Sequence, residues 1–143
     1  MKCTVIIDPS HEEEVIIYAK EMTDEICELQ RAASQNKSEL IGYNQFEAAV
    51  LAQSEIICFF VEDGKVIAMT ERGNFKMKER LYALEEILGT SFVKINQSCI
   101  ANTRAIKKFE SSFGGSLRVV FKNGHSDYIS RRQIKAVKER FGL

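Results

Sequence analysis

The sequence predicts a mainly β domain with short helices, preceded by an N-terminal strand and a long amphipathic helix. Two patterns support this fold class. After residue 40, short β-branched and aromatic runs alternate with Gly, Asn and Asp turn residues, and before residue 34, apolar residues recur every three or four positions. The length of 143 residues suffices for one domain with an appendage. With 45% hydrophobic and 28% charged residues, the composition is that of a folded protein and excludes a disordered chain.

The N-terminal segment is predicted to form a strand over residues 3–7 and then one long helix. Asp8 and Pro9 are residue types that begin helices, and a single apolar stripe follows them for about five turns. The stripe consists of Val15, Tyr18, Met22, Ile26, Leu29 and Ala33. The stripe can pack on the following domain or pair with a second copy of the chain, and the sequence is compatible with both alternatives.

A small, polar stretch at residues 32–38 ends the helical periodicity and is the best candidate for a linker. We therefore expect an N-terminal βα extension over residues 1–38, with a dimerisation or regulatory role, and a second domain over residues 39–143.

Two β-hairpins are predicted in the second domain. Residues 56–70 contain two apolar runs on either side of Asp63-Gly64, and residues 117–129 contain two on either side of Asn123-Gly124. Both dipeptides are typical of two-residue hairpin turns, because they tolerate positive φ angles. Shorter strands are expected at residues 41–44, 47–51, 73–77, 92–95 and 105–110.

Two short helices complete the predicted domain. Leucines at helical spacing predict a helix over residues 78–88, which Gly89 would end. A closing helix is expected to begin at Ser130, which stands at capping-box spacing from Gln133. The apolar face of this closing helix consists of Ile134, Val137 and Phe141.

The residue types that carry catalysis and metal binding are sparse. The four cysteines, Cys3, Cys27, Cys58 and Cys99, lie among apolar residues without a CxxC pair, so we expect buried free thiols. The two histidines and the acidic runs have no partner at catalytic spacing, which predicts no enzyme activity, no metal, no cofactor and no small-molecule substrate. The N-terminus does not resemble a secretory signal, and no apolar run approaches the ~18 residues of a membrane span, so we expect a cytoplasmic protein.

The neutral total charge hides a strong asymmetry. Residues 1–91 carry 9 basic and 17 acidic side chains, whereas residues 92–143 carry 11 basic and 3 acidic ones. A basic block of this kind is expected of a protein that binds a phosphate backbone. The alternative is that the acidic N-terminal part pairs with this block inside one fold.

The positions of particular basic and amide residues favour DNA binding. Arg131 and Arg132 directly follow the predicted cap at Ser130, where a helix dipole disfavours cations unless an anion is bound. Asn102 ends an apolar run, and Arg104 follows closely. Asn can bond adenine and Arg can bond guanine in bidentate fashion, although Asn102 taken by itself is more typical of a plain turn.

Several ordered segments resemble the LytTR DNA-binding domain of bacterial transcriptional regulators. They are residues 92–95, 98–102, 106, 115–124 and 128–135, and residues 54–65 look like the first hairpin of that domain. The resemblance implies a mainly β fold whose loops enter successive major grooves, usually as two copies on repeated half-sites. About 39 residues precede the matching part, too few for the receiver domain of response regulators, so the chain resembles stand-alone members. A membrane-bound inhibitor is a further partner that the resemblance suggests.

The resemblance also places the groove-entering residues. It implies base contacts at the turn that contains Gly64, at Asn102 and at Arg132. Family members often carry a larger polar side chain where this chain has Gly64, so Lys65 is the expected substitute. They often carry a basic residue where this chain has Asn96-Gln97, which is expected to change phosphate contact or base preference. The full set of expected DNA-binding residues is Gly64, Lys65, Lys94, Asn102, Arg104, Lys107, Arg131, Arg132 and Lys135.

The sequence thus predicts a sequence-specific DNA-binding transcriptional regulator, with promoter DNA and a second copy of itself as partners. The alternative is a non-enzymatic interaction module whose basic half docks an acidic partner and whose apolar helix seals an oligomer.

Overall fold

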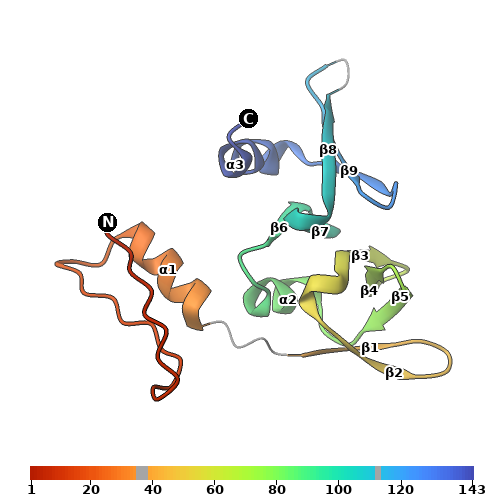
Figure 1. The fold of residues 1–143 in the computed structure, drawn as a ribbon. Coiled ribbons are helices and arrows are strands. Elements are labelled where there is room, and N and C mark those ends of the chain that lie inside the picture. The colour runs from red at the N-terminus through yellow and green to blue at the C-terminus, as the bar shows by residue number, and fades with distance from the viewer. Residues whose placement is uncertain (35–38, 112–113) are drawn as a thin grey trace. The chain divides into compact units, whose positions relative to one another are not determined.

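The computed structural model describes residues 1–34, 39–111 and 114–143. The chain forms two compact units, Met1–Ser34 and Gln35–Leu143 (Figure 1). In the described part of the second unit, ten strands form two sheets and are accompanied by two helices, so the prediction of a mainly β fold is confirmed. No helix in the described residues is long and apolar enough to span a membrane. Residues 35–38 of the predicted linker lie outside the described residues.

The first unit contains one helix, α1, which spans Asp24–Ser34. The Thr23 hydroxyl accepts a hydrogen bond from the Ile26 N–H at 3.2 Å and thereby caps the helix start. Residues 1–23 form neither helix nor strand, so the predicted strand at 3–7 and the helix start at Asp8 are wrong. The Asp8 carboxylate instead accepts from the Ser10 N–H and closes a local turn. An amphipathic helix is present, but it covers only the end of the predicted stripe.

The larger sheet of the second unit has seven antiparallel strands in the order β2-β1-β5-β4-β3-β7-β6. The strands are β1 Leu40–Tyr43, β2 Ala48–Leu51, β3 Ile56–Glu62, β4 Lys65–Thr70, β5 Gly73–Met77, β6 Phe92–Asn96 and β7 Cys99–Asn102. Short 3₁₀ turns, η1 at Gln53–Glu55 and η2 at Thr103–Ala105, precede β3 and follow β7. Strand β7 is not among the strands expected from the sequence, although residues 99–101 are apolar.

The smaller sheet has the order β10-β9-β8. Its strands are β8 Ile106–Ser111, β9 Leu117–Phe121 and β10 Ser126–Ile129, and the two helices of this unit are α2 Leu81–Ile87 and α3 Arg131–Phe141. Both predicted hairpins are confirmed, with φ of 51° at Asp63 and 72° at Gly64 in the first turn. The predicted capping box at Ser130 does not form, because the Ser130 side chain makes no cap hydrogen bond. The Gln133 N–H donates instead to the backbone carbonyl of Ser130.

Two hydrophobic clusters lie on the larger sheet. One consists of residues from β1 to β5, β7 and α2, with Phe59 and Leu84 fully buried at its centre. The other joins β3, β6 and β7 to the smaller sheet and α3, with Phe121 and Val137 at its centre. The larger sheet therefore packs against α2 in one cluster and against the smaller sheet with α3 in the other.

The cysteines divide between the two units. Cys58 and Cys99 are buried in the second unit, whereas Cys3 and Cys27 are exposed in the first. The expectation of buried thiols is therefore wrong for two of the four. The neighbouring Cys58 thiol and burial both raise the pKa of Cys99, so its thiol stays protonated at neutral pH.

Candidate nucleic-acid interface

Strand directions bring two turns of the larger sheet to the same end. Strand β3 runs toward the Asp63-Gly64 turn, and β7 is antiparallel to it, with Phe60 opposite Cys99. The turn at Gln97 and Ser98, which connects β6 to β7, therefore lies beside the end of β3. A hydrogen bond of 3.0 Å from the Val61 N–H to the Ser98 carbonyl joins the two.

The start of α3 is attached to the same end of the sheet. The Ser130 N–H donates to the Ile95 carbonyl at 2.9 Å, directly after β10. The Asn96 side chain, which is 1% exposed, donates to the Tyr128 carbonyl at 2.9 Å and holds β10 against β6. We refer to the Asp63-Gly64 turn, the Gln97-Ser98 turn and the start of α3 together as the Gly64 edge.

The Gly64 edge presents exposed polar groups to solvent. Lys65, Gln97, Arg131 and Arg132 are all exposed, as is Gly64. The first-turn amides of α3 add a partial positive charge beside the two arginines. Two carboxylates of the hairpin, Glu62 and Asp63, lie at the same end, so the positive charge is greatest on the α3 side. Cations hold phosphates, and Gln and Arg side chains can bond base edges in bidentate fashion, so this edge has the chemistry to read a duplex.

Gln97 is not among the DNA-binding residues expected from the sequence. The resemblance singles it out only as a departure from the basic residue that family members often carry. Because residues 99–102 are a strand, Gln97 and Ser98 form a two-residue turn between strands, and both are exposed. A strand prediction for residues 99–102 would therefore have pointed to Gln97. The strand was missed because it has only four residues.

Asn102 lies at the opposite end of the larger sheet and is 3% exposed. Its Nδ2 donates to the Ile56 carbonyl at 2.8 Å, and its Oδ1 accepts from the Arg104 N–H at 3.1 Å. The six remaining residues of β3 separate Ile56 from the Gly64 edge, a distance of about 20 Å. The structure therefore gives Asn102 a positioning role inside the protein, and a base contact would require both hydrogen bonds to break. The alternative prediction for Asn102, a turn residue without a base contact, therefore agrees better with this geometry.

The other expected residues also divide between the two ends. Arg104 is exposed and belongs to the end that contains Asn102, and exposed Lys107 follows it at the start of β8. Lys135 is exposed on α3, one turn after Arg131. Lys94 is half-buried on β6, and its Nζ lies 4.0 Å from a carboxylate oxygen of Glu85 on α2. The structure thus brings together Gly64, Lys65, Arg131 and Arg132, with Lys135 nearby, but not Asn102, Arg104 or Lys107.

A mainly β domain with exposed cations and polar turns along one edge of its larger sheet has the surface chemistry of a nucleic-acid-binding domain. Comparison with known families identifies the class more closely. The LytTr DNA-binding domain matches residues 47–142. The chain belongs to this LytTR family of DNA-binding domains, and as such it is not an enzyme.

Known proteins resemble the chain over its whole length. Proteins of Staphylococcus aureus strains RF122 and NCTC 8325, each named as an uncharacterized HTH-type transcriptional regulator, are 35% identical to it over 146 residues. Each match covers 100% of this chain and 99% of the relative. A solved LytTr DNA-binding domain, from a protein of Bacillus cereus described as a methyl-accepting/DNA response regulator, shares the fold with a TM-score of 0.72 at 19% identity. That match covers 76% of this chain and 100% of the solved domain.

Proposed function

We propose that this protein is a cytoplasmic transcriptional regulator that binds operator DNA in a sequence-specific manner through its Gly64 edge. One observation carries the proposal: three segments far apart in the sequence meet at one end of the sheet and expose Lys65, Gln97 and the arginines at the start of α3. The names of the Staphylococcus aureus relatives as transcriptional regulators support it.

Each residue of the edge has a distinct role in this proposal. Arg132 and Gln97 contact base edges in the major groove, because guanidinium and carboxamide groups match guanine and adenine. Lys65, Arg131 and Lys135 contact phosphates and supply affinity that does not depend on sequence. Gly64 allows the backbone of the first turn to come close to the duplex, since it adds no side chain.

Two copies of the protein bind repeated half-sites in this proposal. The unit Met1–Ser34 supports it, because it leaves large apolar side chains exposed that a second copy can cover, among them Val15, Ile16 and Met22. A membrane-bound inhibitor is the other partner that we consider for this unit. The competing function, an interaction module with a basic docking face, predicts no preference among DNA sequences.

Selection of bound DNA from a random pool tests the proposed function. We expect an enriched sequence with two spaced half-sites. Replacement of Arg132 by Ala should weaken binding to that sequence by roughly 1 to 3 kcal/mol, because it removes a base contact from an exposed side chain.

A matched control for this variant is Lys138→Ala, which removes an exposed cation from the last turn of the same helix. It should leave the preference for the selected sequence unchanged. A pool without enrichment would contradict the proposal and favour the interaction module. Equal binding by the Arg132 variant and the parent would exclude the base-reading role of Arg132.

A further inference from the structure

Arg104 lines a cavity at the end of the larger sheet that lies opposite the Gly64 edge. The cavity has a volume of about 310 Å³, and its polar lining includes Ser54, Glu71, Arg72, Arg104, Lys122 and Asn123. A second cavity of about 530 Å³ shares Ser54, Asn102 and Arg104 with it. Volumes of this size are typical of sites for small ligands.

Hydrogen bonds hold the elements around this cavity in place. The buried Asn102 amide ties η2, which carries Arg104, to the start of β3. The Lys122 N–H donates to the Ala105 carbonyl at 2.9 Å and ties the β9–β10 turn to η2. Because their backbones are joined in this way, the Arg104 and Lys122 side chains emerge from fixed positions beside the same cavity.

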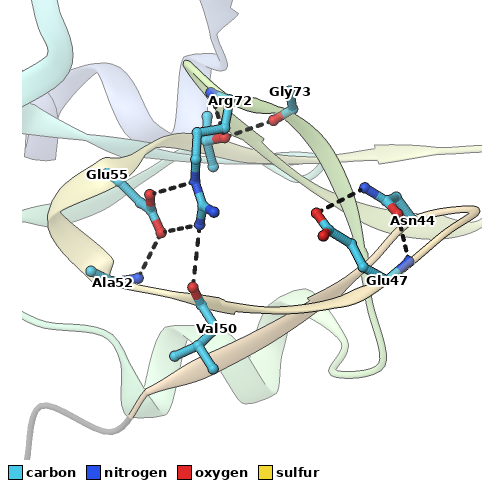
Figure 2. A network of polar contacts seen from close by, with 8 residues as sticks. Asn44, Glu47, Val50, Ala52, Glu55, Arg72 and Gly73 are labelled. Atoms are coloured by element: carbon cyan, nitrogen blue, oxygen red, sulfur yellow. Dashed lines mark hydrogen bonds and ion pairs between the residues drawn. The ribbon is translucent and has the colours of Figure 1, made fainter.

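Arg72, the third cation of the cavity, is already neutralised. Its Nε and Nη2 donate to the two carboxylate oxygens of Glu55 at 3.0 and 2.9 Å, and Nη2 also reaches the Val50 carbonyl (Figure 2). The Arg72 hydrogen bond lowers the pKa of Glu55, in keeping with an ionised pair. Glu55 and Arg72 both line the cavity, and apart from this pair the lining holds two cations, Arg104 and Lys122, and one carboxylate, Glu71.

The two remaining cations form no ion pair in the part of the chain that the structure describes. Among residues 1–34, 39–111 and 114–143, no carboxylate lies within 4.0 Å of Arg104 or Lys122. Arg104 and Lys122 are too far from the Gly64 edge to attract DNA toward it. The two ends of β3 lie about 20 Å apart, whereas salt screens exposed charges beyond ~8 to 10 Å.

We propose that Arg104 and Lys122 form a phosphate-binding site separate from the Gly64 edge. The Ser54 hydroxyl and the Asn123 amide line the same cavity and add neutral hydrogen-bonding groups. Two sources of the phosphate have the required chemistry: a phosphate-bearing solute, or the backbone of an operator whose flanks bend toward this end of the protein. The second source rests on the proposed function.

Titration of the full chain with inorganic phosphate tests the first source. Amide NMR signals of Arg104, Ala105, Lys122 and Asn123 should shift, and the shifts should disappear in Arg104→Gln and Lys122→Gln. Both residues are exposed, so these variants should fold, and thermal melts check this. Lys138→Gln is the matched control and should leave the titration unchanged.

Two duplexes that share the selected sequence test the second source, one limited to that sequence and one with flanks on both sides. On the long duplex, Arg104→Gln should lower the slope of log affinity against log salt by about 1, with no change on the short duplex.

Absence of phosphate binding, together with an unchanged salt slope on the long duplex, would overturn the proposal. A parent protein that binds inorganic phosphate but selects no DNA would contradict the proposed function and leave this site standing.

Discussion

The two ends of the larger sheet use the same residue types in opposite ways. At the Gly64 edge, the Gln97 amide is exposed in a turn, and the arginines at the start of α3 face solvent. At the other end, the Asn102 amide is buried, and both of its polar atoms bond to the backbone. A polar side chain beside an apolar strand can thus stay open to solvent or join elements of the fold, and its burial and internal hydrogen bonds distinguish the two cases.

Replacement of Asn102 by Ala should have the largest effect on stability. The change removes two hydrogen bonds and leaves the Ile56 carbonyl buried without its donor, which should lower the free energy of unfolding by about 2 to 4 kcal/mol. Urea unfolding followed by circular dichroism measures the loss. A midpoint equal to that of the parent would show that the amide does not hold η2 to β3.

The equivalent truncation at the Gly64 edge, Gln97→Ala, should have the opposite profile. Its free energy of unfolding should stay within about 0.5 kcal/mol of the parent, because the side chain is exposed. Its discrimination at one base pair of the selected sequence should fall by about 1 to 2 kcal/mol. Competition binding with single-base variants of the site measures this. Unchanged discrimination at every base pair would remove Gln97 from the base-reading residues.

The parts of the second unit that were predicted correctly have strong local signals. Asp63-Gly64 and Asn123-Gly124 determine their hairpins through backbone conformations that few other dipeptides adopt. Strand β7 lacks such a signal, because its four residues are all buried and show no alternation of exposed and buried positions. The burial of Asn102 follows from this strand, because the end of the apolar run is the end of a buried strand and not the start of an exposed loop.

The N-terminal segment shows how far periodicity alone can mislead. The apolar spacing continues from Val15 to Ala33, yet the helix begins only at Asp24. Ile26, at 8% exposure, is the buried member of the stripe in the described residues, whereas Val15 and Met22 are 68% and 66% exposed. Helices in water depend on packing of their apolar face, so a stripe without a partner surface does not stabilise its upstream turns.

The ion pair between Arg72 and Glu55 should have the smallest effect, and it should depend on pH. Glu55→Gln removes a pair whose side chains are 29% exposed for Glu55 and 51% for Arg72, so solvent screening limits the expected loss at pH 7 to about 0.5 kcal/mol. The pKa of Glu55 is lowered from its ordinary value of 4.5. The contribution should therefore be complete above about pH 4.5 and should decline as the pH falls through the lower folded-state pKa.

Urea unfolding of the parent and Glu55→Gln between pH 7 and pH 3 measures this decline. Glu47→Gln is a matched control, because it removes the same charge from an exposed residue that forms no ion pair within the described part of the chain. The difference between parent and Glu55→Gln should shrink toward low pH, whereas Glu47→Gln should follow the parent throughout. A difference that stayed constant with pH would mean that the loss in Glu55→Gln comes from a weaker hydrogen bond from the Ala52 N–H or from altered packing. The stability of this end of the sheet would then owe nothing to the charge of the pair.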